Sequence, residues 1–560
     1  MHLALLVAWQ LQAAGLEVAT RGADAFRLGD SLHDLSRARG AQVSFERSRR
    51  SLLPTSSASG GRCDVRLGRY CWWYDDRVPS FPPESEIIGR RRTQLLADLD
   101  ALGARYGGDD WLSAMRVHYR VDGRDLPGAD SVARTCRATG WWCSALVGYA
   151  AHARGNGRVA DSAFASALAA MPADIACAWR NITPLLADDE RDGYAHRTCE
   201  ARGELERRYW LLSRPQLSSA ANEWQNEFNV RRVLVWLGER GATPHLLTWG
   251  TDAAELVLRY GWPVAWSRMV TSGAPGAEAG IIGHDPSPSF VFAPRAVFTD
   301  SLHPVADDRW DLHAPRGESR YAPRLVKRVA GIAVQVARFR RGDSTLVVAA
   351  YAAADDSLRA PVAIIGAAAT DGAIRLGVDS ARTGRAVVTI AGMPVLVGVE
   401  VTDTLTRTLA RSRAAFVPTA PLSVSDLLFY RSDRDPATRL DSALTKAIPG
   451  DTVTRNRQLG IFWETYDPIA GGEGVEVAVS VERIDRGWMR STRQRLGLTP
   501  LDTPIRMRWT DGRPAGNGAT AHAVSLDLTN LDAGRYRVTL TLGPAYRALA
   551  STSREMQLSP

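Results

Sequence analysis

The sequence predicts a multidomain protein with an α-helical N-terminal domain, a central α/β module and two C-terminal antiparallel β-sandwich domains. First, its 560 residues are too many for one hydrophobic core. Second, apolar residues recur at helical spacing up to about residue 240. Third, they alternate with a period of two beyond about residue 328. We therefore expect segments at 1–20, 21–200, 201–325, 326–420 and 421–560.

The composition is that of a folded protein, with 45% hydrophobic and 23% charged residues, and it excludes wholesale disorder. The net charge of +8 is spread along the chain and is not gathered into blocks, so we expect no nucleic-acid partner. No apolar run reaches the roughly 18 to 20 residues of a membrane-spanning helix. Residues 3–9 have the length of a signal-peptide core, although no basic residues precede them. The two interpretations of 1–20 are a signal-like segment, which we favour because of the cysteines, and a plain first helix.

All six cysteines precede residue 200. An even number confined to one region favours disulfides in an oxidising compartment, and the spacings lack the paired C-x-x-C steps of a zinc site. The alternative is six buried free thiols in a cytosolic protein. Because short loops close at the least entropic cost, we predict pairing between neighbours in the sequence. The expected pairs are Cys63–Cys71, Cys136–Cys143 and Cys177–Cys199, in an exported protein that is periplasmic or extracellular.

An internal repeat covers residues 109–171. An offset of 31 residues aligns Trp111 with Trp142 and His118 with Tyr149. In each copy an apolar helix precedes glycine-containing turn residues and a second, alanine-rich helix. The repeat predicts two stacked helical hairpins and resembles the tetratricopeptide type. The alternative is an irregular helical domain.

A tryptophan-containing segment, Thr248–Pro263, has polar turn residues before the apolar run 256–258, which predicts a strand that Pro263 ends. Upstream, residues 203–240 have helical spacing, with Glu227 and Arg231 four apart and expected to pair. From about Arg207 to Arg268 the chain resembles the GWxTD-domain family, bacterial exported proteins whose activity is not established. Thr248 stands where that family has its first glycine, and Arg214 where it has an aspartate. The residues that carry the resemblance are Asn222, Glu223, Trp249, Thr251, Asp252, Arg259, Tyr260, Gly261 and Pro263.

The C-terminal half has the alternation of antiparallel strands, as in Val334–Phe339 and Ala386–Ile390. Further strands are expected within 475–479, 505–509, 524–528 and 536–542. Asp532–Tyr536 is a turn into a strand, which is typical of the end of immunoglobulin-like sandwiches.

No known catalytic motif is present: the sequence has no G-x-S-x-G, no H-E-x-x-H and no phosphate-binding loop. The candidate catalytic cluster is His284, Asp285 and His303, near Asp252, which would suit acid–base work or metal binding. The simpler interpretation is that Asp285 accepts backbone amides in a turn. We expect Glu464 to lie on a strand and either to face solvent or to pair with an arginine.

The sequence thus predicts a non-catalytic exported protein that acts as an interaction or scaffolding module in the bacterial cell envelope. We expect a protein partner, no cofactor and no metal, and Asp252 and Arg259 in structural positions. The alternative is a hydrolase or metal-dependent enzyme with its site near Asp252, His284 and His303. Neither a ligand nor an oligomeric state can be named from the sequence.

Overall fold

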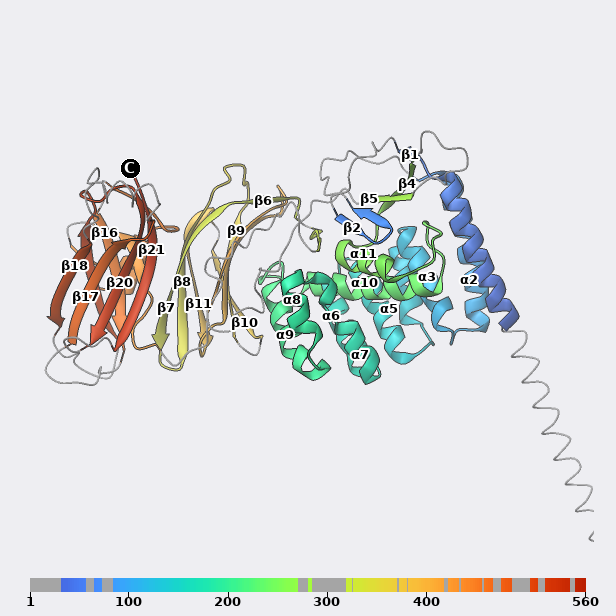
Figure 1. Ribbon diagram of the computed structural model, residues 1–560, viewed down its shortest axis with the longest axis horizontal. Coiled ribbons are helices and arrows are strands. Elements are labelled where there is room, and N and C mark those ends of the chain that lie inside the picture. Colours follow the sequence, from blue (N-terminus) through green and yellow to red (C-terminus); the bar gives the residue numbers. More distant parts are fainter. Residues whose placement is uncertain are drawn as a thin grey trace, which may run out of the picture. The chain divides into compact units, whose positions relative to one another are not determined.

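The computed structural model divides into a helical N-terminal unit and a β-rich C-terminal unit (Figure 1). The first unit takes in Met1–Trp210, Ala220–Val291 and His313–Pro323, and the second takes in Leu211–Ser219, Phe292–Leu312 and Arg324–Pro560. No helix in the described part of the chain is long and apolar enough to cross a membrane. The structure describes residues 32–56, 65–72, 84–269, 281–284, 319–324, 326–369, 372–379, 381–416, 422–432, 435–455, 458–466, 475–485, 504–511, 519–543 and 549–560.

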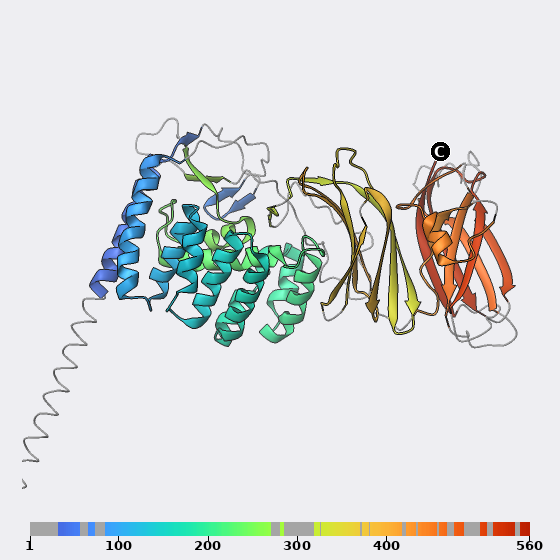
Figure 2. The same ribbon diagram turned by 180° about the vertical axis from the view of Figure 1, so that it is seen from behind.

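The first unit is built mainly of consecutive helices, coloured from blue to green in Figures 1 and 2. Short polar side chains begin several of them, because a side-chain oxygen satisfies an amide at the open end of a helix. Asp109 accepts from the amide of Leu112, for example, and Asn156 accepts from that of Val159. After the helical residues 32–52 come α2 (Glu86–Arg105), α3 (Asp110–Asp122), α4 (Leu126–Arg134), α5 (Gly140–Ala153), α6 (Gly157–Ala170), α7 (Ala173–Arg180), the 3-10 helix η1 (Thr183–Leu185), α8 (Asp188–Ala195), α9 (Cys199–Leu212), α10 (Glu223–Arg240) and α11 (Thr251–Tyr260).

Helices α3 to α6 occupy the region of the predicted repeat as two successive helical pairs. Trp142 is fully buried, and its indole N–H donates to the carbonyl of Asp110 in the preceding pair (3.0 Å). The hydroxyl of Tyr149 lies 3.2 Å from Nδ1 of His118, the residue to which the 31-residue offset assigns it. His118 and Tyr149 therefore face one another across the interface between the two pairs, and Trp142 bonds the residue next to Trp111.

The predicted strand at 256–258 is wrong, because these residues belong to helix α11. Ala253, Val257 and Tyr260 are its buried residues at helical spacing, so packing of that face decides the structure. The helix ends at Tyr260 because Gly261 adopts a left-handed conformation (φ 86°), and so Pro263 ends no strand.

A small sheet completes the first unit, in the order β1 (Thr55–Ser56), β4 (Ala265–Met269), β5 (Ile281–His284). Strand β1 pairs parallel with β4, and β4 pairs antiparallel with β5. A separate hairpin, β2 (Val65–Leu67) and β3 (Tyr70–Trp72), lies beside α11 (Figure 1).

The second unit contains two pairs of facing sheets. The sheet β10-β9-β12-β13-β6 shares a core with β11-β8-β7, and β14-β16-β19 shares one with β15-β21-β20-β17-β18. Neighbouring strands pair antiparallel, except that β6 on β13 and β15 on β21 are parallel. The elements are β6 (Arg328–Ala330), β7 (Ile332–Arg341), β8 (Ser344–Ala353), β9 (Val362–Ala368), β10 (Ile374–Asp379), β11 (Thr383–Ala391), β12 (Leu396–Asp403), β13 (Thr408–Ala415), β14 (Leu428–Arg431), α12 (Leu440–Thr445), β15 (Thr452–Thr454), β16 (Gln458–Thr465), β17 (Val475–Arg483), β18 (Ile505–Asp511), β19 (Thr520–Asp527), β20 (Gly534–Gly543) and β21 (Ala550–Ser559).

A further apolar cluster joins these two halves of the second unit. It places Phe339 and Val348, from β7 and β8, against Tyr430 and Phe462, from β14 and β16. Polar contacts accompany it, because Gln335 donates to the carbonyls of Phe429 (2.9 Å) and Ile448 (2.7 Å). The two pairs of sheets therefore share buried contacts.

The segment Leu211–Ser219, which we call the strap, lies on the sheet of β9, β12 and β13. The carboxylate of Glu400, 1% exposed, accepts hydrogen bonds from the amides of Leu217 (2.6 Å) and Ser218 (3.1 Å). A Cβ atom on Gly366 or Gly398 would stand 2.9 Å from the Leu217 side chain, so glycine at both positions admits it.

Two buried arginines complete the binding of the strap. Arg411 donates to the carbonyl of Pro215 (2.7 Å), and Arg413 donates to that of Leu212 (3.1 Å). Arg413 also pairs with Glu400 (3.3 Å), so the carboxylate compensates the charge of Arg413 while both groups hold the strap.

Candidate functional site

Asp252, the central residue of the tryptophan-containing segment, lies in the first turn of α11 and forms an ion pair with Arg69. Both bonds of the Arg69 guanidinium to the carboxylate are 2.8 Å long. The carboxylate also accepts from the backbone amides of Arg69 (3.1 Å) and Ala253 (2.8 Å). The hydrogen bond from Arg69 holds the pKa of Asp252 well below its usual range.

The turn of the β2–β3 hairpin is shaped to receive Asp252. Gly68 adopts a positive φ of 52°, and a Cβ atom there would stand 2.6 Å from that of Asp252. The ion pair therefore fastens the hairpin to the first turn of α11.

Arg231 on α10 is the main polar link to the other end of α11. Its guanidinium, on a side chain 3% exposed, donates to the carbonyls of Leu258 (3.0 Å), Arg259 (2.8 Å) and Arg320 (2.7 Å). It pairs with Glu227 at 2.8 Å, which confirms the predicted contact. These bonds satisfy carbonyl groups that the end of a helix leaves open.

The other polar residues near the ends of α10 and α11 also bond within the fold. Arg259, 5% exposed, pairs with Glu255 one turn earlier (2.6 Å). Asn222 caps α10, and its side-chain amide donates to the carbonyl of Trp210 (2.8 Å). Glu223 accepts from the hydroxyl of Tyr321 (3.4 Å).

The uncharged residues of the motif fill space around the same helices. The ring of Trp249 lies against Gly238, where a Cβ atom would stand 2.3 Å from it. Tyr260 is 2% exposed, and Pro263 packs against Gly283. Thr251, by contrast, is exposed at the start of α11.

Of the three candidate catalytic residues, only His284 lies within the described part of the chain; Asp285 and His303 lie outside it. His284 ends β5, and its Nε2 lies 2.5 Å from the hydroxyl of Ser267 on β4. Burial lowers the pKa of His284 to about 4, so the imidazole is neutral at pH 7. His284 and Asp252 bond different partners.

Sequence reasoning missed Ser267, although a serine and a neutral histidine in contact are two parts of a nucleophilic site. Ser267 is 3% exposed. Trp266, the preceding residue, is also buried and lies against Trp262 and His245. Among the described residues no group of three His, Cys, Asp or Glu side chains could hold a metal ion.

A second group that the sequence did not reveal is a buried ionic network in the first unit. Arg49 and Arg92 both bond the carboxylate of Asp122 (3.2 and 2.8 Å). Glu46, 2% exposed, accepts from the hydroxyl of Tyr119 (2.7 Å). Burial raises the pKa of Glu46 to about 7, although Arg49 acts in the opposite direction. The network joins residues 32–52 to α2 and α3.

In the second unit, Glu464 on β16 is 5% exposed, so the expectation that it faces solvent is wrong and the pairing alternative is confirmed. The Arg341 guanidinium donates to both of its oxygens (2.6 and 3.0 Å), and the hydroxyl of Tyr466 donates as well (2.9 Å).

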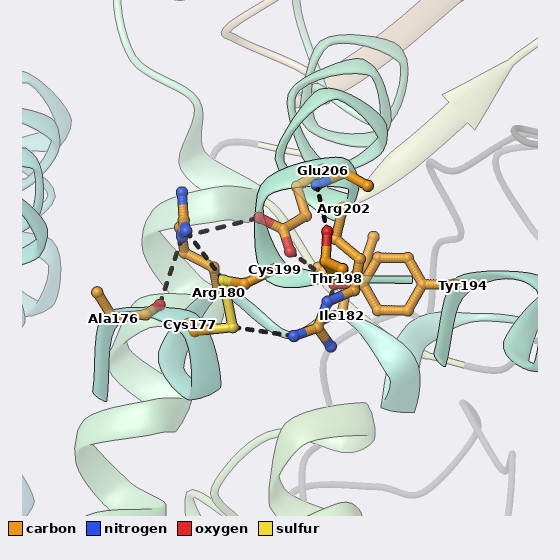
Figure 3. The surroundings of a disulfide bond; sticks show 10 residues. Ala176, Cys177, Arg180, Ile182, Tyr194, Thr198, Cys199, Arg202 and Glu206 are labelled. Atoms are coloured by element: carbon orange, nitrogen blue, oxygen red, sulfur yellow. Dashed lines mark hydrogen bonds and ion pairs between the residues drawn. A yellow bond between two sulfur atoms is a disulfide. The ribbon is translucent and has the colours of Figure 1, made fainter. Parts of the chain in front are cut away.

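Two of the predicted disulfides are confirmed, Cys136–Cys143 and Cys177–Cys199. The pairing Cys63–Cys71 is not described, since Cys63 lies outside the described residues. The sulfurs of Cys177–Cys199 accept hydrogen bonds from two arginines, Arg180 and Arg202 (Figure 3).

No protein-family model and no curated protein match the chain. Among solved structures, the chain is similar to the crystal structure of red sea bream transglutaminase, with 10% sequence identity and a TM-score of 0.15. The match covers 56% of this chain and 43% of that one, so the chain spans less than half of that protein's length. A TM-score this low does not establish a shared fold.

Proposed function

We propose that this chain is an exported, non-catalytic protein that acts as an interaction or scaffolding module in the bacterial cell envelope. The observation that carries the proposal is the use made of the charged motif residues. Asp252 joins the β2–β3 hairpin to α11, and Arg259 pairs with Glu255 within α11. Arg231, which lies outside the motif, joins α10 to the end of α11. Side chains used in this way hold the fold together and are not themselves available for chemistry.

The arrangement of the modules supports the same proposal. Stacked helical pairs of the tetratricopeptide type present extended binding surfaces. The hydroxyl of Tyr536, at the start of β20, donates to the carbonyl of Asp532 (2.8 Å). This contact resembles the tyrosine corner of immunoglobulin-like sandwiches, which are common in cell-surface proteins. We assign α9 to α11 with β4 and β5 to the GWxTD-like module.

The disulfides support export. Cys136–Cys143 and Cys177–Cys199 fit an oxidising compartment, and such bonds are rare in the reducing cytosol. The periplasm or the cell exterior is therefore the proposed location.

A hydrolase is the second candidate, because of the contact between Ser267 and His284. A hydrolase of this type needs an accessible nucleophile and a third group that orients the histidine. Ser267 is 3% exposed, and Asp252 is engaged by Arg69. Both facts favour the scaffold over the hydrolase.

A fluorophosphonate probe, which reacts with activated serines, separates the two candidates. We expect no labelling of the full-length native protein above the level of a heat-denatured sample. Labelling that is lost in Ser267→Ala and retained in a control variant, Ser51→Ala, would establish the hydrolase. Ser51 is exposed and bonds only the carbonyl of Ser48 among the contacts described.

A partner is sought separately, by cross-linked capture from the envelope fraction of the producing bacterium. The expected result is a protein whose recovery is abolished by excess untagged chain and which, when tagged, recovers this chain. If no protein meets both criteria, the interaction proposal fails.

A further inference from the structure

The disulfide Cys177–Cys199 lies between two guanidinium groups (Figure 3). Arg202 donates to the sulfur of Cys177 (2.9 Å), and Arg180 donates to that of Cys199 (3.4 Å). Cys177 belongs to α7, and Cys199 is the first residue of α9. Both cysteines are partly exposed residues.

These positive charges favour the reduced state over the disulfide. A disulfide sulfur is neutral and accepts hydrogen bonds weakly, whereas a thiolate accepts a strong, charge-assisted bond from a guanidinium. Arginine neighbours and helix N-termini are the surroundings that stabilise thiolates in proteins. Each cysteine has its own arginine, and Cys199 also lies at the positive end of the α9 dipole.

The arginines are held in place by contacts that do not depend on the disulfide. Arg180 lies 3.8 Å from the buried carboxylate of Glu206, which also accepts from the hydroxyl of Tyr194 (2.7 Å). The guanidinium of Arg202 lies over the ring of Tyr194 at 5.3 Å. Both cations therefore remain beside the sulfurs when the bond between the sulfurs breaks.

The surrounding helices have anchors of their own. The indole of Trp179, 7% exposed, donates to Asn229 on α10 (2.9 Å). Ile182 is fully buried, and its amide donates to the hydroxyl of Tyr194 (3.3 Å). Reduction of the disulfide is therefore compatible with a folded α7 and α9.

We propose that Cys177–Cys199 is a thiol–disulfide exchange site that accepts electrons from an external thiolate. The thiolate attacks one of the two sulfurs and forms a mixed disulfide, and the other cysteine leaves as a thiolate beside its arginine. A second external thiolate attacks the mixed disulfide and releases the remaining cysteine. The two external thiolates become one disulfide, and two electrons pass to the protein cysteines, which are left as two thiolates; the protons that the external thiols lose on ionisation go to solvent.

The other disulfide of the same unit provides an internal reference. Cys136–Cys143 is also partly exposed, and it joins the end of α4 to α5. Within the described residues no arginine donates to either of its sulfurs. A difference in how easily the two disulfides are reduced therefore reflects their surroundings, because both are measured in the same protein and the same buffer.

The test is reduction of the native, full-length protein in graded dithiothreitol or glutathione buffers. Acid quenching, alkylation and peptide mass spectrometry then quantify each disulfide separately. We expect Cys177–Cys199 to be half reduced at a ratio of reduced to oxidised reagent about tenfold or more below the ratio that half reduces Cys136–Cys143. A third arm uses reduced thioredoxin, and its rate relative to glutathione shows whether a protein dithiol or a small thiol is the better donor. Equal or harder reduction of Cys177–Cys199 in all three arms would overturn the proposal.

Arginine variants test the cause. In Arg202→Gln and Arg180→Gln we expect a smaller difference in ease of reduction between Cys177–Cys199 and Cys136–Cys143. The decrease should be larger for Arg202, whose hydrogen bond to sulfur is shorter. The matched control is Arg197→Gln, which removes an exposed arginine bonded to the carbonyl of Gly193. Circular dichroism verifies that each variant is folded. A difference unchanged in both test variants, or equally reduced in the control, would refute the role of the two guanidinium groups.

Discussion

Replacing Arg231 by methionine is the most direct test of how α11 is held. Methionine keeps a long apolar stem over the ring of Trp224, above which the guanidinium lies at 4.8 Å, but it removes every donor. Three carbonyls and the carboxylate of Glu227 then lose the guanidinium. The carbonyl of Arg259 keeps the amide of Arg320 as a donor, and Glu227 keeps its contact with His152. A buried carbonyl left without a donor costs about 1–3 kcal/mol, although such costs are not additive.

The buried ion pair sets the expected magnitude. Removing one partner of such a pair costs about 3–5 kcal/mol, so we expect Arg231→Met to lower the free energy of unfolding of the first unit by about 4 kcal/mol. The double variant with Glu227→Gln should recover about 1–2 kcal/mol, because the carboxylate is then no longer left uncompensated. Arg240→Met, an exposed arginine on the same helix, is the control and should cost less than about 1 kcal/mol.

The assay is guanidinium chloride unfolding of the full-length chain at pH 7, with hydrogen exchange to assign transitions to each unit. The pKa of Glu227 is lowered because Arg231 and His152 outweigh the effect of burial. The contribution of the pair is therefore present above the usual glutamate pKa and lost as the pH falls below it. A loss below about 1 kcal/mol in Arg231→Met, or an equal loss in Arg240→Met, would refute this account.

Three further predictions concern the first unit. Asp252→Ala and Arg259→Ala should each lower the melting temperature of the first unit without loss of any activity or ligand binding. An Asp252→Ala protein that melts like wild type but loses an activity or a ligand would show that the motif is a functional site. Trp249→Ala should cost about 3 kcal/mol by denaturant unfolding, because the ring is partly buried against Gly238, and a loss below about 1 kcal/mol would contradict that packing. Burial lowers the pKa of His118 from 6.5 to about 4, so its stabilisation is complete above pH 6.5 and lost as the pH falls towards 4. His118→Asn should flatten the fall in the unfolding midpoint between pH 7 and pH 4, and an unchanged slope would contradict it.

Local pattern was sufficient for much of the fold. Strands β7, β11 and β20 alternate between buried and more exposed residues as expected, and two disulfides close the short loops that the sequence suggested. Helix α11 was misread because three adjacent apolar residues conceal its period; Leu256 is only partly buried, whereas Val257 and Leu258 are buried. The carbonyls at its end are satisfied by Arg231, which no local pattern reveals.

The polar groups of the site depend on distant pairings for the same reason. Ser267 meets His284 only because β4 and β5 pair antiparallel. The partner of Asp252, Arg69, lies 183 residues earlier. Glu46 bonds the hydroxyl of Tyr119, which follows it by 73 residues in sequence. Contacts between residues so far apart in the chain cannot be predicted from the local pattern of a single sequence.

The strap is synthesised well before the residues that bind it. Glu400 follows its partner Leu217 by 183 residues, and Arg413 follows its partner Leu212 by 201 residues. At about 5–20 residues per second, the strap therefore leaves the ribosome roughly 10–40 s before its sheet can exist. During that interval Leu217, which is 2% exposed in the finished protein, has no apolar surface from that sheet to cover it. Secretion before the last strands are made would prolong this interval, so the chain between α9 and α10 is where a chaperone or a protease would first meet the unfinished molecule.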